Sequence, residues 1–204
     1  MKHVVVDLGN VIALFDHRRA SRQLASLSTV PVTEDEVFRA IFDSSLEPDL
    51  DCGRISPQDF LDRLRTLLHI AAPDDAIMRA WCDIFRPNES VVALLPRLKG
   101  SAARLLLASN TNPLHFEWLL RQMPEPLALF DECVLSYQVG VRKPAPDFFR
   151  RCAAAAGGVP GDCVFVDDRH EFVEEARALG MAGVTYYQGL DLAEALRAKG
   201  VVLA

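Results

Sequence analysis

The sequence predicts an α/β protein in which a doubly wound, Rossmann-like parallel sheet core carries an inserted four-helix cap. Two observations predict this fold. In the central and C-terminal parts of the 204-residue chain, strand-like apolar runs alternate with helix-like stretches, as in a parallel sheet with crossover helices. The segment 16–86 differs, because it contains no convincing strand and its apolar residues recur at helical spacing.

The expected core elements follow one another in regular order. Strands are predicted near 3–7, 103–108, 132–135, 163–166 and 182–185. Helices are predicted over 88–99, 113–122, 145–156, 170–179 and 190–199. Gly180 and Gly200 are placed as the C-terminal stops of the last two helices.

Four blocks of helical spacing lie between the first and second strands, and a simple crossover needs only one helix. Thr33 with Glu36 fits a capping box, and Ser56-Pro57 followed by Asp59 fits an N-cap with proline in the first turn. Helices should therefore begin near 34 and 57. We expect residues 1–15 and 87–204 to form the catalytic core and residues 16–86 to form a helical cap over the sheet edge.

Composition limits the possible partners. Half of the residues are hydrophobic and a quarter are charged, as in an ordinary globular protein. The net charge of −6 argues against a nucleic-acid partner, and no apolar run approaches the ~20 residues that span a membrane. Five scattered cysteines without CxxC spacing indicate neither a disulfide framework nor a zinc site. We expect a cytoplasmic monomer or homodimer.

Chemistry-bearing residues follow three of the predicted strands. Asp7 ends the first, Ser109 the second and Asp167-Asp168 the fourth, while Lys143 lies between the last two of these sites. Open parallel sheets bind ligands at the carboxyl ends of their strands, so these side chains should converge. Clustered carboxylates favour a divalent cation, and Mg²⁺ prefers oxygen ligands. An acid, a hydroxyl, a lysine and a metal suit phosphoryl transfer to a small-molecule phosphate ester.

The order of these segments resembles the haloacid dehalogenase (HAD) superfamily, and within it the phosphatases that carry a helical cap after the first motif. The four matching segments are VVVDLGNV at 4–11, LASNTN at 107–112, GVRKP at 140–144 and VFVDD at 164–168. The Asp-Leu-Gly-Asn start and the cap segment 53–56 are similar to the bacterial alpha-D-glucose-1-phosphate phosphatase group. Four motifs in this order are far more specific than any one alone.

The resemblance implies a role for each matching residue. Asp7 would be the nucleophile that becomes an aspartyl phosphate, Ser109 would bind the transferring phosphoryl group, and Lys143 would hold both. Asp7 and Asp168 would ligate Mg²⁺, with support from Asp167 and a further ligand in the backbone carbonyl of Gly9. The residues expected to bind substrate are Asn10, Ser109, Asn110 and Lys143.

Two positions depart from the commonest family pattern. Most family phosphatases have a general acid two residues after the nucleophile, where this chain has Gly9. Asp16 is a candidate substitute, although it could equally be a helix N-cap. Relatives usually have Asn or Asp at the position of Phe172, and Glu171 is a candidate compensation.

Several residues keep two interpretations. Phe15 and Phe42 are expected either in packing or in the substrate pocket, and so is Trp118. His170 could lie near the metal, because it follows the last motif closely.

The sequence favours a Mg²⁺-dependent phosphatase for a small phosphate monoester, with a sugar phosphate preferred through the resemblance. One alternative is a metal-independent 2-haloacid dehalogenase, which also lacks the second acid of the first motif. Paired acids at 167 and 168 disfavour it, because a metal-free site has little use for them. The other alternative is a non-catalytic ligand-binding protein of the same fold.

Overall fold

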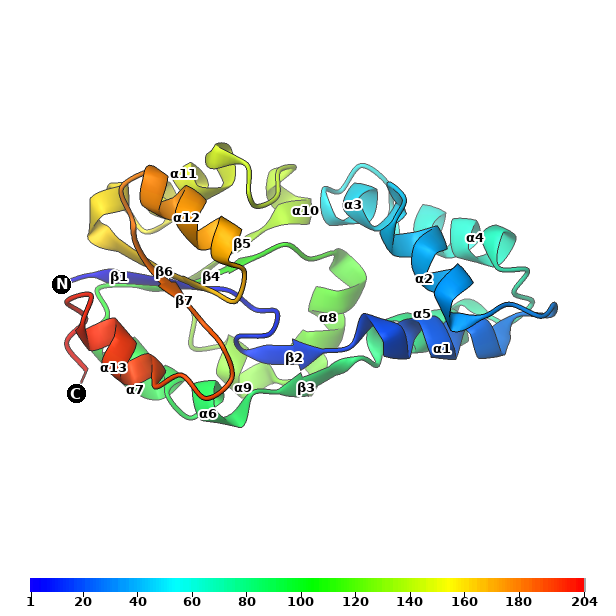
Figure 1. Cartoon of the computed structure of the whole chain (residues 1–204), viewed down its shortest axis with the longest axis horizontal. Coiled ribbons are helices and arrows are strands. Elements are labelled where there is room, and N and C mark those ends of the chain that lie inside the picture. Colours follow the sequence, from blue (N-terminus) through cyan, green and yellow to red (C-terminus); the bar gives the residue numbers. More distant parts are fainter. Residues whose placement is uncertain (204) are drawn as a thin grey trace.

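A computed structural model describes residues 1–203 of the chain. Its five-stranded parallel sheet has the order β5-β4-β1-β6-β7, which confirms the predicted α/β class and all five core strands (Figure 1). The strands are β1 (His3–Val6), β4 (Leu105–Ser109), β5 (Glu132–Leu135), β6 (Cys163–Asp167) and β7 (Ala182–Thr185). Val5 of the central strand is in register with Leu106 and Phe165.

Helices cover both faces of the sheet, which explains why the interiors of its central strands are apolar. On one face Val4 and Val6 pack against α6 (Glu89–Val92), α7 (Leu95–Ser101), α8 (Pro113–Gln122) and α13 (Leu192–Arg197). On the other face Val5 packs against α11 (Pro146–Ala155) and α12 (His170–Ala178). Three short helical segments complete the core: α9 (Pro124–Leu127), α10 (Ser136–Val139) and the 3-10 turn Pro160–Asp162.

The helix predicted over 88–99 is two helices, α6 and α7, so that expectation is wrong in its continuity. Pro96 lies in the first turn of α7. Because proline has no backbone N–H to donate to the preceding turn, it fits a helix start and not a helix interior.

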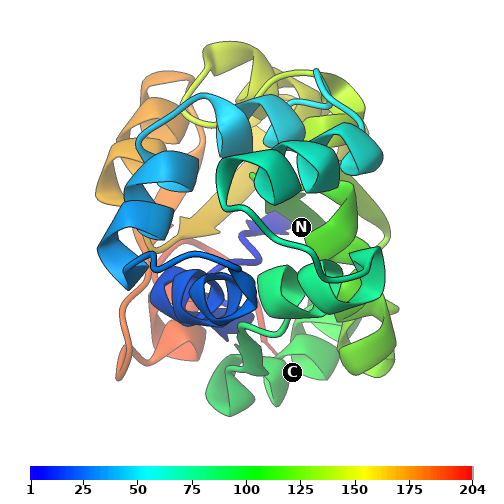
Figure 2. The same ribbon diagram turned by 90° about the vertical axis from the view of Figure 1, so that its right-hand side faces the viewer.

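The segment between β1 and β4 is helical, with five helices where four were predicted. They are α1 (His17–Leu27), α2 (Glu34–Phe42), α3 (Leu46–Asp51), α4 (Pro57–Leu67) and α5 (Asp74–Cys82), and the six-residue α3 is the addition. Capping boxes at Thr33 and Ser56 confirm the predicted starts of α2 and α4. The helices enclose their own apolar cluster around Phe60 and Trp81, and we call this group of five helices the cap (Figure 2).

Two short strands, neither of them predicted from the sequence, join the cap to the core. β2 (Ala13–Phe15) pairs antiparallel with β3 (Phe85–Pro87), so that Phe15 lies opposite Phe85. The expectation of no strand within 16–86 is therefore wrong at its last residues. The division at residues 15/16 and 86/87 stays a prediction. None of the helices in the described chain combines the length and apolar character needed to cross a bilayer.

Candidate active site

The carboxyl ends of three neighbouring strands meet at one cavity of about 300 Å³. Asp7 directly follows β1, Ser109 ends β4 and Asp167 ends β6. The chain leaves β1 toward β4 on one side and later returns to β6 on the other, and such a reversal opens a crevice at the central strand. Asp7 and Ser109 line the cavity together with Lys143 and Asp168, so the residues predicted to converge do so.

Lys143 is buried and bridges two carboxylates. Its Nζ donates to Oδ1 of Asp7 and Oδ2 of Asp167, each at 2.6 Å, and to the carbonyl oxygen of Ala108 at 3.1 Å. Asn110 fixes the backbone of Lys143, because its Nδ2 donates to the Lys143 carbonyl at 2.9 Å and its Oδ1 accepts from the Lys143 N–H at 2.8 Å. The side-chain amide of Asn110 therefore positions Lys143.

Three acids form a cluster that a cation would fit. Carboxylate oxygens of Asp7, Asp167 and Asp168 lie within 4.8 Å of one another, and Nδ2 of Asn10 donates to Oδ2 of Asp168 at 3.1 Å. Within residues 1–203, Lys143 is the one side-chain cation bonded to the cluster, so three acids share one bonded positive charge. All-oxygen donors of this kind are the ligands that Mg²⁺ prefers.

The charges at this site perturb one another. Burial raises the pKa of Asp7 to about 8 and Asp167 adds to the rise, whereas the Lys143 ammonium opposes it. Burial alone would lower the pKa of Lys143, but the carboxylates of Asp7 and Asp167 outweigh it and raise that pKa. Burial likewise raises the pKa of Asp168. A divalent cation would reverse the effect on the acids, because it favours their ionised form.

The place of the missing general acid is filled by an aromatic ring. A Cβ built on Gly9 would lie 2.8 Å from Cε1 of Phe15 and 3.8 Å from Oδ2 of Asp7. Phe15 is confined by His17, at 4.6 Å between ring centroids, and by Phe85 at 6.1 Å. Glycine at position 9 is therefore matched to phenylalanine at position 15.

The candidate substitutes for missing groups lie outside the cavity. Asp16 is the N-cap of α1, accepts from the N–H of Arg18 and pairs with Arg22, which confirms its helix-cap interpretation. It does not line the cavity that holds Asp7, so the geometry gives the general-acid interpretation no support. Glu171 is exposed and pairs with Arg169, away from the acid cluster.

Other side chains near the last motif do not bind the cluster either. The Phe172 ring lies 5.4 Å from Nζ of Lys143, so it packs over the ammonium and offers no oxygen ligand. His170 is exposed and pairs with Glu174, which does not fit the metal-site interpretation.

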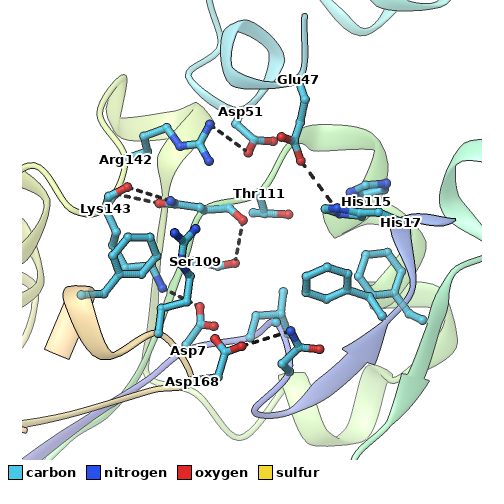
Figure 3. A pocket seen from close by; sticks show the side chains of 18 of the residues that line it. Asp7, His17, Glu47, Asp51, Ser109, Thr111, His115, Arg142, Lys143 and Asp168 are labelled. Atoms are coloured by element: carbon cyan, nitrogen blue, oxygen red, sulfur yellow. Dashed lines mark hydrogen bonds and ion pairs between the residues drawn. The ribbon is translucent and has the colours of Figure 1, made fainter. Parts of the chain in front are cut away.

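The cap supplies the wall opposite the acid cluster, and most residues of this wall were not predicted from the sequence. Figure 3 shows Glu47 and Asp51 of α3 across the cavity from Asp7 and Asp168. Phe15 and Phe42 line the cavity, whereas Trp118 packs against the cap cluster. The remaining lining residues that carry polar side chains and were not predicted are His17, Thr111, His115, Arg142 and Arg169.

Asp51 joins the cap to the core. Its Oδ1 accepts from Nδ2 of Asn112 at 3.1 Å, and its Oδ2 lies 3.8 Å from Nη1 of Arg142. Burial raises the pKa of Asp51 to about 6, while Arg142 and Asn112 oppose the rise. His115 completes this group through Asn112, and burial lowers its pKa to about 3.

Comparison with known proteins gives the class of this one. The sequence matches the haloacid dehalogenase-like hydrolase family over residues 1–180, and the chain belongs to that family. Both the predicted superfamily and the predicted hydrolase class are thereby confirmed.

Individual relatives are named phosphatases. The chain is 26% identical to a D-ribitol-5-phosphate phosphatase of Bacteroides thetaiotaomicron, over 94% of each chain. It is 28% identical to the sesquiterpene phosphatase astK of Aspergillus oryzae, over 82% of this chain and 87% of that one. Among solved structures, a HAD family enzyme of B. thetaiotaomicron in complex with magnesium and inorganic phosphate superposes with a TM-score of 0.84 at 25% identity, covering 97% of this chain and 100% of that one.

Proposed function

We propose that this protein is a Mg²⁺-dependent phosphatase that hydrolyses a small phosphate monoester, with a sugar or polyol phosphate as substrate, through an aspartyl phosphate on Asp7. The observation that carries the proposal is the buried contact of Lys143 with Asp7 and Asp167 at the floor of a cavity. Family membership and the named phosphatases among the relatives support it.

The nucleophilic attack and the stabilisation of the phosphoryl charge each have a residue in place. A carboxylate oxygen of Asp7 attacks the phosphorus, and the bond to the leaving-group oxygen breaks as the aspartyl phosphate forms. Water then attacks the phosphorus, which releases inorganic phosphate and restores the Asp7 carboxylate. Lys143 offsets charge on the phosphoryl oxygens, and Ser109, Asn10 and the backbone near Asn110 donate hydrogen bonds to them.

The acid cluster is the proposed magnesium site. Asp7, Asp168 and the carbonyl of Gly9 would hold the cation directly, and Asp167 would support it from its bond to Lys143. Bound Mg²⁺ would neutralise charge on the phosphoryl oxygens. The relative solved with magnesium and phosphate supports this assignment.

The proposed reaction has no protein acid at position 9, so the leaving group receives its proton from solvent. General acid catalysis is typically worth ~10²–10⁴ in rate, and turnover should be slow by comparison with relatives that have the acid. We further propose that the cap, residues 16–86, encloses the substrate and excludes bulk water.

The test is a panel of phosphate esters incubated with the purified protein and Mg²⁺, read as phosphate release. The panel includes p-nitrophenyl phosphate, D-ribitol 5-phosphate, alpha-D-glucose 1-phosphate and farnesyl monophosphate. We expect turnover that EDTA abolishes and excess Mg²⁺ restores. Asp7→Asn should lose activity, whereas Glu174→Gln, an exposed acid paired with Arg177, should keep it.

Two outcomes would favour the rival functions. Chloride release from 2-chloropropionate in the presence of EDTA would indicate a dehalogenase. Binding of Mg²⁺ and phosphate with no turnover on the whole panel would indicate a non-catalytic protein. Activity of Asp7→Asn equal to that of the parent would remove Asp7 from the mechanism.

A further inference from the structure

Glu47 stands out on the cap wall because no hydrogen bond within the described residues reaches its carboxyl group. Glu47 and Asp51 are four residues apart on α3 and therefore face the same way, into the cavity. Asp51 is bonded to Asn112, whereas the nearest ion-pair atom of Glu47 in the described chain is Nε2 of His17 at 3.9 Å. That separation is too long for a hydrogen bond.

The Glu47 side chain is 17% exposed and lines the cavity. Polar groups that are largely removed from water are nearly always hydrogen-bonded in proteins. Because no hydrogen bond within the described residues reaches Glu47, its carboxyl group is available to polar atoms of a ligand in the cavity.

His17 presents a fixed polar edge beside Glu47. Its ring stacks on Phe42 at a centroid distance of 4.3 Å and lies 4.6 Å from the Phe15 ring. Burial lowers the pKa of His17 to about 4, so at neutral pH the ring has one N–H donor and one acceptor nitrogen.

The surroundings of Glu47 favour its protonated form. Burial raises its pKa to about 8, Asp51 adds to the rise and Arg142 opposes it. The carboxyl then offers one O–H donor together with acceptor oxygens. A neutral carboxyl beside a neutral imidazole complements groups that both donate and accept, which is the property of alcohol hydroxyls. It gives no counter-charge to an ammonium group and no apolar surface to a hydrocarbon.

We propose that Glu47, with His17, is the specificity-determining residue that hydrogen-bonds the hydroxyls of the leaving group, so that the site selects polyhydroxylated over hydrocarbon phosphate monoesters. The inference rests on the proposed phosphatase function and adds the residue that makes the choice. The rings of Phe15 and Phe42, which flank His17, pack against the C–H surface of the same leaving group. A site built to bond a substrate hydroxyl discriminates strongly against analogues without it, because its polar groups are then left unpaired.

The test compares native protein with Glu47→Met, which removes the polar atoms at similar length, and with Glu47→Gln, which keeps a donor and an acceptor. Asp49→Asn is the matched control, since Asp49 lies on the same helix, pairs with Arg54 and does not line the cavity. The substrates are D-ribitol 5-phosphate, farnesyl monophosphate and p-nitrophenyl phosphate.

For the polyol phosphate we expect kcat/KM to fall about 10- to 200-fold in Glu47→Met and less in Glu47→Gln, as for one or two lost hydrogen bonds. For p-nitrophenyl phosphate the change should stay below about threefold, because only the polyol bonds to Glu47. Asp49→Asn should behave like the native protein on all three substrates.

The inference is overturned if Glu47→Met loses all three substrates equally, or if the native protein prefers farnesyl monophosphate. The proposed function fails separately, if no ester is hydrolysed with Mg²⁺ present. Binding then decides the inference: D-ribitol 5-phosphate should raise the Tm of the native protein and of Asp49→Asn but not of Glu47→Met. Equal shifts in all three proteins would count against it.

Discussion

The substitution Gly9→Asp introduces an acid two residues after Asp7 and tests whether the Phe15 ring occupies the space that this acid would need. In Gly9→Asp the new Cβ would lie 2.8 Å from Cε1 of Phe15, closer than side-chain carbons pack. The ring also contacts His17 and Phe85, so moving it away from the new side chain disturbs those ring contacts. Overpacking of this kind costs about 1–3 kcal/mol. We expect Gly9→Asp to unfold more easily by that amount and to gain no activity.

Removing the ring should rescue the substitution. The stability loss of Gly9→Asp is measured against the native protein, and that of Gly9→Asp/Phe15→Ala is measured against Phe15→Ala. We expect the second loss to be at most half of the first. The kcat of the double variant should exceed that of Phe15→Ala by about tenfold or more, since a positioned general acid contributes ~10²–10⁴. Urea unfolding and phosphate release measure the two effects in a double-mutant cycle.

An aromatic residue of cap helix α2 supplies the control. Phe38 lies under the Arg18 guanidinium and does not line the cavity, so Phe38→Ala should give Gly9→Asp no relief. The reasoning is refuted if Gly9→Asp alone is as stable as the native protein. It is also refuted if Phe38→Ala rescues the variant as well as Phe15→Ala does.

Three further perturbations follow from the same contacts. Asp7→Asn should raise the Tm of the metal-free protein, because burial disfavours the ionised acid. The same variant should show a smaller Tm increase on addition of Mg²⁺ than the native protein does. An undiminished Mg²⁺ shift would contradict the proposed site. Gly53→Ala should destabilise the protein by about 1–3 kcal/mol in urea unfolding, because Gly53 has φ +66° and an added Cβ would lie 2.5 Å from the Tyr137 carbonyl oxygen. Unchanged stability would mean that the backbone at Gly53 moves away from Tyr137 at no cost. Because the pKa of Glu47 is raised from 4.5 to about 8, the native protein should lose stability relative to Glu47→Gln as pH rises from 4.5 to 8, by at most about 1.4 kcal/mol per pH unit. Urea unfolding curves of both proteins at pH 5 and pH 8 check the sign. An equal difference in unfolding free energy between the two proteins at both pH values would refute the prediction.

The parts of the fold that could be predicted are those with strong local signals. Val4-Val5-Val6 is buried on both sides, so its apolar run is continuous and easy to recognise. The capping boxes at Thr33 and Ser56 fix helix starts through contacts only three residues apart. By contrast, α3 has six residues with Pro48 among them, and β3 has three that end in Pro87, so neither produces a periodic pattern.

The floor of the site was predictable and its cap wall was not, for a physical reason. Asp7, Ser109 and Asp167 belong to strand ends, where parallel pairing brings distant segments together in a known way. Glu47 and His17 reach the cavity only through the packing of the cap on the core, which no local spacing encodes. The two acids spaced four apart at 47 and 51 are the one available signal, because that spacing places both on one helix face.

The pairing of β2 with β3 bears on how such a protein can acquire new substrates. Since Phe15 lies opposite Phe85, the polypeptide leaves and re-enters the sheet domain at adjacent points. The paired strands β2 and β3 already hold the two ends of the inserted segment together. An insert of a different length or sequence therefore adds little to the entropic cost of closing this loop. We expect that transplanting the intervening segment from a relative would exchange the selectivity of the enzyme while leaving its phosphate chemistry in place.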